Sequence, residues 1–250
     1  MQKNNVPQTH CEQQKFAERL KQTFSRNQFP LSTRQVEQLT RYRSELRRWN
    51  AVMNLTTITE DVEILEKHFL DSLSILNHIT LTADDAVIDI GTGAGFPGIV
   101  LKIYVPDIRL TLVEASQKKV SFLKFLIAQL GLEGTIVLAS RAEECAQQPV
   151  HTGAYDWVVT RYVASLAESA GYCVPLLKPN GKWVAYKSGA ELSTEIRDSE
   201  KRLTALGGIV DTVFSGKNSG AALTRSYIVV RRLNATSFSK EERQRKRYEF

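Results

Sequence analysis

Apolar residues in the N-terminal third of the chain recur at helical spacing. Ser32 and Gln35 have the spacing of a capping box, which predicts that a helix begins there. The apolar positions that follow, three, four or seven residues apart, are Val36, Leu39, Leu46, Trp49 and Met53. After a polar turn at 54–59, a second run of this kind carries Val62, Leu65, Phe69, Leu73 and Leu76. We therefore expect two amphipathic helices, each with one buried face.

From Ala86 onward the pattern changes to short apolar runs that alternate with helical stretches such as 118–130. These runs have the length and the β-branched content of buried strands. The candidate strands are 87–90, 110–114, 135–139, 157–160, 183–187, 208–214 and 226–231. Such alternation predicts an α/β fold with a mostly parallel sheet covered on both faces. A ligand would then bind at the C-terminal ends of the strands.

The same pattern divides the chain into four predicted parts. They are an N-terminal helical extension at 1–30, a helical cap at 31–80, an α/β core at 81–233 and a basic C-terminal tail at 234–250. The boundary between the cap and the core falls near 81–85, and we expect the tail to be loosely ordered.

Composition narrows the class of protein. With 250 residues, 42% of them hydrophobic, the chain can bury one sizeable core. Its apolar runs are too short to span a bilayer, and its first residues lack the apolar segment of a secretory signal, so we expect a soluble cytoplasmic protein. Cys11, Cys145 and Cys173 have neither the number nor the spacing of a disulfide framework or a zinc site. We therefore predict no metal.

Basic residues are concentrated in two places. The net charge is +6, and the clusters are Arg41, Arg43, Arg47 and Arg48 in the first predicted helix and Lys240, Arg243, Arg245, Lys246 and Arg247 near the C-terminus. A polyanion such as nucleic acid would bind clusters of this kind. A solvated helix face and a frayed tail explain each cluster equally well.

The strongest chemical signal is the turn after the first candidate strand. Residues 87–98 form an apolar run that ends in Asp89 and then opens into Gly91, Gly93, Gly95 and Gly98. Glycines let the backbone adopt positive φ and let a ligand approach the main chain. The letters fit both the dinucleotide fingerprint, with Gly93, Gly95 and Gly98, and the first motif of S-adenosylmethionine (SAM) methyltransferases, with Gly91, Gly93 and Gly95.

Charge favours SAM over a dinucleotide. Asp89 would lie beside the pyrophosphate of a dinucleotide, whereas SAM has no phosphate and carries an ammonium and a sulfonium group that a carboxylate attracts. Glu114 ends the second strand, where an acid can accept ribose hydroxyls in either kind of site. Residues 139–143 follow the third strand, where Glu143 could bind an adenine ring or serve as an N-terminal helix charge.

The acceptor position after the fourth strand reads Thr160-Arg161-Tyr162-Val163-Ala164. It lacks the Asn/Asp-Pro-Pro-Tyr motif for exocyclic amines and the Pro-Cys nucleophile for pyrimidine C5. The simplest acceptor is therefore an atom that is already nucleophilic, such as guanine N7, with catalysis mainly by alignment. Arg161 and Lys187 could hold a phosphate or the guanine O6 edge, Arg161 could instead orient the SAM carboxylate, and Lys187 could be a plain surface residue.

Several motifs together resemble one family. Trp49-Asn50-x-x-x-Asn54-Leu55-Thr56, His68-x-x-Asp71-Ser72-Leu73, the glycine turn up to Ile99, and Arg161 are similar to the glucose-inhibited division protein B family, the bacterial small-subunit ribosomal RNA guanine-N7 methyltransferases. The resemblance runs from about 31 to 230. It implies SAM-dependent N7 methylation of one guanine in the decoding-site loop of 16S RNA. This sequence departs from the family pattern in three places. Phe96 stands where leucine is common, Tyr162-Val163 replaces an alanine-containing pair, and the C-terminal tail is unlike the usual ending.

The resulting hypothesis is a class I SAM-dependent methyltransferase, a Rossmann-like, mostly parallel seven-stranded sheet with an N-terminal helical subdomain. Carried over by position, the resemblance implies cofactor contacts at Gly91, Phe96, Ala142, Glu143 and Arg161. The full predicted cofactor set adds Asp89, Gly93, Gly95 and Glu114, and Arg161 is the predicted catalytic residue. The predicted RNA-binding residues are Arg43, Arg47, Arg48, His68 and Lys187. The expected partner is 16S ribosomal RNA or the small subunit, bound by a monomer.

Three questions stay open from the residues. His68 and Asp71 lie on one helical face and either bridge the two subdomains or form a wall of the guanine pocket. The alternative functions are an NAD-dependent oxidoreductase that uses Gly93, Gly95 and Gly98, and a catalytically silent RNA-binding module. Whether the substrate is naked RNA or an assembled particle is also open.

Overall fold

The N-terminal part of the molecule is helical, as the periodicity predicts. The computed structural model describes residues 10–187, 192–216 and 225–234. Its first helices are α1 (His10–Arg26) and α2 (Thr33–Met53). The capping box forms, because the Gln35 N–H donates to Ser32 Oγ at 3.3 Å and the Ser32 N–H donates to Gln35 Oε1 at 2.8 Å. The predicted start of α2 is therefore confirmed.

The second helical run is less regular than its apolar spacing predicts. It consists of α3 (Asp61–Glu63), a stretch of wide π-type turns η1 (Ile64–Leu70), α4 (Asp71–Leu73) and a 3-10 turn η2 (Ser74–Asn77). A spacing of three and four residues fits helices of different width, so it cannot distinguish these forms. Wide turns of the π type occur frequently at functional sites, and His68 lies in this one.

The rest of the described chain forms the predicted α/β sheet. Its strands are β1 (Ala86–Ile90), β2 (Arg109–Glu114), β3 (Thr135–Ala139), β4 (Tyr155–Arg161), β5 (Leu177–Lys187), β6 (Gly208–Gly216) and β7 (Arg225–Arg232). They form one seven-stranded sheet in the order β3-β2-β1-β4-β5-β7-β6. Only β7 runs antiparallel to its neighbours β5 and β6. The fold class is confirmed.

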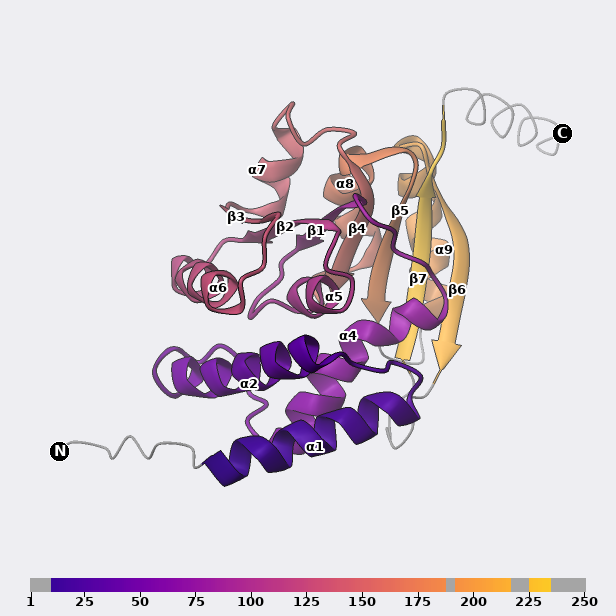
Figure 1. The fold of residues 1–250 in the computed structure, drawn as a ribbon. Helices are drawn as coiled ribbons and strands as arrows, with labels where there is room; N and C mark the ends of the chain where they lie inside the picture. Colours follow the sequence, from indigo (N-terminus) through magenta and orange to yellow (C-terminus); the bar gives the residue numbers. More distant parts are fainter. Residues whose placement is uncertain (1–9, 188–191, 217–224, 235–250) are drawn as a thin grey trace, which may run out of the picture.

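Helices cover both faces of the sheet, as Figure 1 shows. The helices are α5 (Gly98–Tyr104), α6 (Gln117–Leu130), α7 (Ala142–Gln147), α8 (Leu166–Leu176) and α9 (Leu192–Ala205). Adjacent residues of β1 face opposite sides: Val87 joins the core with α5 and α6, and Ile88 joins the core with α8 and α9. This alternation follows from the period of two in a strand.

The N-terminal helices share the first of these two cores. Leu39 of α2 and Phe69 of η1 belong to the same buried cluster as Val87. Gln35 Nε2 also donates to the Ile103 and Tyr104 carbonyls, at 3.1 and 3.0 Å, and Gln38 Nε2 donates to the Leu130 carbonyl at 2.8 Å. These carbonyls lie at the C-terminal ends of α5 and α6, where a helix has no partner of its own for them.

β5 is longer than its predicted range of 183–187. Its first residues include exposed polar positions such as Asn180, so no apolar run marks them. The predicted tail at 234–250 lies outside the described residues beyond Asn234, and the four-part division of the chain stays a prediction. Within the described ranges, none of the helices has both the length and the apolar content needed to cross a membrane.

Candidate cofactor turn and acceptor site

The glycine turn leaves the C-terminal end of β1 with three residues in the left-handed region. The φ values are 69° at Gly91, 62° at Gly93 and 101° at Gly95. A Cβ added at Gly91 would lie 2.9 Å from Val163 Cγ2, and one at Gly95 would lie 2.6 Å from Ile99 Cδ1. Both backbone conformation and space therefore require glycine at these two positions.

Asp89 lies beneath this turn and is fully buried. Its Oδ2 accepts hydrogen bonds from Thr92 Oγ1 at 2.6 Å and from the Gly98 N–H at 2.8 Å. Its Oδ1 is buried and has no hydrogen-bond partner among the described residues. Burial raises the pKa of the carboxyl from 3.8 to about 6, although the two hydrogen bonds oppose that rise. Asp89 thus holds the turn with one oxygen and leaves the other unsatisfied.

Gly98 has a different role from the other glycines of the turn. A Cβ there would lie 2.7 Å from Asp89 Oδ2 and 2.8 Å from Leu112 Cδ2. Its φ is not in the left-handed region. Gly98 is therefore required for close packing of α5 against the sheet.

Glu114 supports the turn from the end of β2. Its Oε2 accepts from the Gly93 N–H at 3.0 Å, and its Oε1 accepts from the Ser116 N–H at 2.8 Å. A carboxylate has about four lone-pair sites, so each oxygen keeps capacity for another donor. The two acids that the sequence singles out are both brought to the glycine turn.

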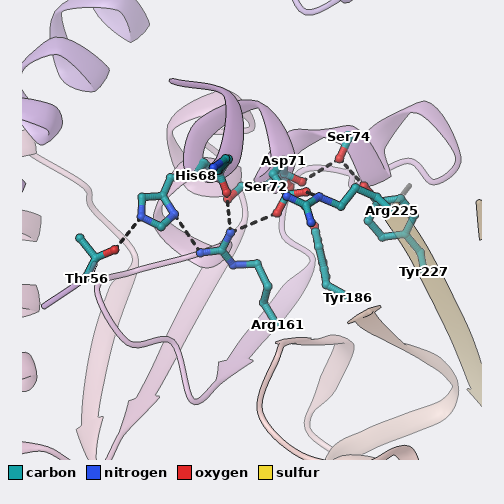
Figure 2. Close-up of polar contacts among 10 residues, drawn as sticks. Thr56, His68, Asp71, Ser72, Ser74, Arg161, Tyr186, Arg225 and Tyr227 are labelled. Atoms are coloured by element: carbon teal, nitrogen blue, oxygen red, sulfur yellow. Dashed lines mark hydrogen bonds and ion pairs between the residues drawn. The ribbon is translucent and has the colours of Figure 1, made fainter. Parts of the chain in front are cut away.

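Arg161 connects the end of β4 to the helical segment (Figure 2). Its guanidinium donates to the Lys67 carbonyl at 3.0 Å, to Asp71 Oδ2 at 3.1 Å and to His68 Nδ1 at 3.2 Å. An arginine can only donate, so His68 Nδ1 is an acceptor and its Nε2–H donates to Thr56 Oγ1, 3.0 Å away. Burial, reinforced by the Arg161 charge, lowers the pKa of His68 to about 3, and the ring is neutral.

Asp71 joins two distant strands through two arginines. Its carboxylate is 1% exposed and binds Arg161 of β4 at 3.1 Å and Arg225 of β7 at 2.7 Å. Burial raises the pKa of Asp71, and the two guanidinium groups oppose that shift. Nearby, Tyr186 Oη donates to the Ser72 carbonyl at 2.8 Å, and Ser74 Oγ contacts Tyr227 Oη (Figure 2). These contacts support the interpretation that His68 and Asp71 bridge the helices to the sheet.

Phe96 is enclosed by side chains from the helices. Its ring stacks on His68, with centroids 4.3 Å apart, and on Tyr42, with centroids 5.1 Å apart. The Arg161 guanidinium carbon lies 5.2 Å from its centroid. Tyr42 also donates to the Ala94 carbonyl of the turn at 2.6 Å. The N-terminal helices therefore hold the glycine turn in place, through Tyr42 of α2 and His68 of η1.

Ala142 and Glu143 begin α7, after β3. Ala139 of β3 is the register partner of Glu114. Ala142 and Glu143 therefore lie at the same end of the sheet as the glycine turn. Ala142 is half-buried and Glu143 is exposed. Their predicted contact with a cofactor stays a prediction.

Lys187 is not a freely projecting surface cation. Its Nζ donates to the Ala164 carbonyl and to Glu195 Oε1, each at 2.6 Å, and its side chain is 14% exposed. It thereby links the loop after β4 to α9. Its predicted contact with RNA would require this ion pair to open.

The prediction that Arg43 binds RNA lacks an open surface, because the Arg43 side chain is buried. It is 1% exposed, forms an ion pair with Asp61 and lies over the Phe16 ring of α1. Arg47 and Arg48 are 42% and 55% exposed. Arg47 pairs with Asp61 of α3, and Arg48 pairs with Glu45 of α2. His68 is 6% exposed and faces Arg161, so its predicted RNA contact also lacks an open surface.

The roles of three residues in this region did not follow from the sequence pattern. Tyr42 lies in phase with Leu39 and Leu46 on the buried face of α2, and that phase could have found it. Arg225 had no such signal, and Tyr162 stood out only as a departure from the family pattern, because the importance of both depends on contacts with each other and with Arg161. Across the described ranges, no group of three or more His, Cys, Asp or Glu residues is arranged to hold a metal ion.

One family model and two named relatives match most of this chain. The family model described as "GidB: rRNA small subunit methyltransferase G" matches residues 35–224. A relative named ribosomal RNA small subunit methyltransferase G from Alkaliphilus metalliredigens is 42% identical over 83% of this chain and 87% of its own. A relative of the same name from Roseiflexus is 44% identical over 72% of this chain and 76% of its own.

A solved structure shows the same fold at low identity. Geranyl diphosphate C-methyltransferase from Streptomyces coelicolor, crystallised with Mg²⁺, geranyl diphosphate and S-adenosyl-L-homocysteine, has a TM-score of 0.53 and 12% identity. The match covers 77% of this chain and 98% of that one. The family match and the identities to its members establish that this chain belongs to the GidB family, rRNA small subunit methyltransferase G.

Proposed function

We propose that this protein transfers the methyl group of S-adenosyl-L-methionine to N7 of one guanine in 16S ribosomal RNA. The observation that carries the proposal is the glycine turn. Three left-handed glycines at the end of β1 lie between two carboxylates, in a chain of the small-subunit rRNA methyltransferase G family. The turn lies at the C-terminal ends of the parallel strands, where such folds bind ligands.

The residues of the turn fit SAM. Gly93 leaves a stretch of backbone without a side chain, which a ligand can approach closely, because a Cβ there would meet only the Gly91 carbonyl oxygen, 4.0 Å away. The unsatisfied Asp89 Oδ1 supplies negative potential for a cationic ligand, and Glu114 keeps acceptor capacity for hydroxyl groups. SAM, when bound, supplies an electrophilic methyl group. The adenine contacts at Ala142 and Glu143 belong to the same proposal.

Guanine N7 suits the side chains at the acceptor position. N7 carries a lone pair and needs no general base, so catalysis requires mainly that the base be held in line with the methyl group. In A-form RNA this atom lies in a deep, narrow groove, so the target is an unpaired or extruded base. Arg161 contributes to this alignment, because Asp71, His68 and the Lys67 carbonyl fix its guanidinium group beside Phe96.

We propose that Arg161 is a positioning residue. The guanidinium N–H groups that do not bind Asp71, His68 or the Lys67 carbonyl would donate to the carboxylate of the cofactor. Conservative replacement tests this role. Arg161→Lys keeps the charge and loses the planar fork that reaches Asp71 and His68 together. We expect a rise in the SAM dissociation constant and a lower kcat, with the pH profile between 6 and 8 unchanged, since no proton is moved by the guanidinium.

One experiment tests the reaction itself. The protein is incubated with methyl-labelled SAM and small ribosomal subunits from a strain that lacks this modification, and the RNA is digested to nucleosides. We expect labelled 7-methylguanosine. A preparation that binds SAM in calorimetry but yields no 7-methylguanosine from subunits, naked 16S RNA or whole ribosomes would contradict the proposal. Tighter binding of NADH than of SAM would support the oxidoreductase alternative.

A further inference from the structure

Tyr162 is a large aromatic residue that the fold leaves on the surface directly after β4. Its side chain is 47% exposed, and its φ of 55° lies in the left-handed region, where residues other than glycine are uncommon. Its N–H donates to the Tyr186 carbonyl at 3.4 Å, so β5 contacts the backbone at this position. Strained residues of this kind cluster at ligand sites.

Two cations flank the Tyr162 ring. The guanidinium carbon of Arg161 lies 5.8 Å from the ring centroid, and that of Arg225 lies 6.0 Å from it. Both arginines bind the single carboxylate of Asp71, so the group of three carries a net charge of +1. An exposed aromatic ring beside positively charged groups is the combination that binds a nucleobase and its phosphate.

The position of this ring relative to the glycine turn points to the base that receives the methyl group. The next residue, Val163, is 41% exposed, and its Cγ2 would lie 2.9 Å from a Cβ at Gly91. Tyr162 therefore follows β4 at the edge of the proposed cofactor turn. The Tyr162 ring is linked to the turn through Arg161, whose guanidinium carbon lies 5.8 Å from the Tyr162 centroid and 5.2 Å from the centroid of Phe96 in the turn.

We propose that Tyr162 is the platform on which the target guanine stacks, with Arg161 and Arg225 providing the positive field beneath it. This inference rests on the proposed function and adds a residue that binds the substrate base. Stacking uses the ring and not the hydroxyl. It also requires the base to leave the RNA stack, as a methyl transfer to N7 does.

The test compares Tyr162→Phe, Tyr162→Trp and Tyr162→Leu. All three keep a side chain with a Cβ at the same left-handed position, so backbone strain changes little, and only leucine removes the aromatic face. The measurements are kcat/KM for methylation of unmodified small subunits and the SAM dissociation constant from calorimetry. We expect phenylalanine and tryptophan to stay within about threefold of wild type, and leucine to lose about 5- to 100-fold in kcat/KM with unchanged SAM affinity.

Each outcome supports or overturns the inference. Leucine with wild-type kcat/KM overturns it, and so does a parallel loss of SAM affinity, because that result would mean that the ring serves only to position Arg161. An inactive wild-type protein overturns the proposed function and this inference together. Circular dichroism and melting temperature of the leucine variant exclude misfolding as the source of a loss.

Discussion

Gly91 combines a backbone requirement with a steric one, which makes it a sharp test of the cofactor turn. We expect Gly91→Ala to weaken SAM binding at least tenfold, because the added Cβ would lie 2.9 Å from Val163 Cγ2 at a φ of 69°. The measurement is calorimetric titration with SAM. Gly131→Ala is the matched control, since Gly131 has a φ of 61° and a Cβ there meets nothing within 4 Å.

Both variants should lose roughly 1 to 2 kcal/mol of stability from the left-handed backbone. Only the one at Gly91 should change SAM affinity. Equal SAM affinity in the two variants would mean that the turn does not contact the cofactor.

Asp89 predicts how SAM binding depends on pH. Its pKa in the protein is about 6, and a bound cation favours the ionised carboxylate and lowers that pKa. Below pH 6 the carboxyl must therefore lose a proton on binding, so affinity falls as the pH falls. We expect the SAM dissociation constant to rise by up to about tenfold between pH 7 and pH 5.

Asp89→Asn removes the titrating group and keeps an oxygen that can accept from Thr92 and Gly98. Its SAM affinity should be weaker at pH 7 and flat between pH 5 and pH 7. If the Asp89→Asn variant keeps the wild-type pH dependence, a titrating group other than Asp89 causes it.

At the scale of elements, α2 supports the glycine turn through one hydroxyl group. Tyr42 is fully buried and donates to the Ala94 carbonyl at 2.6 Å. We expect Tyr42→Phe to lose about 1 to 2 kcal/mol of stability and to weaken SAM binding several-fold, because a buried carbonyl of the turn loses its donor. Urea unfolding and calorimetry measure the two effects.

Tyr155→Phe is the control for this prediction. Tyr155 is also buried and its hydroxyl contacts His151 Nδ1 at 2.8 Å, but it lies at the start of β4, away from the turn. It should lose similar stability without any change in SAM affinity. If both variants bind SAM normally, α2 supports the fold and not the site.

The elements differ in how well the sequence predicted them. The strands and α2 follow from local patterns, because alternation and a capping box act over a few residues. The π-type turns of η1 did not follow, since their apolar spacing resembles that of an α-helix. The beginning of β5 was missed because residues 178–181 interrupt its apolar run: Leu177 pairs with Tyr155, the register then shifts, and pairing continues from Lys182.

At the scale of the whole molecule, Asp71 holds the helices, β4 and β7 together. We expect Asp71→Asn to lose roughly 3 to 5 kcal/mol of stability, because it leaves two partly buried guanidinium groups without their counter-charge. For a chain of this size that corresponds to a fall of roughly 10 °C or more in melting temperature.

Glu63→Gln is the matched control from the same helical segment. Glu63 pairs with Lys67 on the surface, where both side chains are more than 40% exposed. Its loss should cost well under 1 kcal/mol. Comparable melting temperatures for the two variants would show that Asp71 is not a structural link.

Family membership, the order of strands and helices, and the acids around the glycine turn could all be predicted from the sequence by itself. These properties depend on neighbours in the chain, where spacing and residue type determine the backbone. Tertiary structure decided that Arg43 is buried while Arg48 is exposed, and that Asp71 meets Arg161 and Arg225 beside the Tyr162 ring. Burial and ion pairing depend on which surfaces the packing covers, and residues far apart in the chain supply those surfaces.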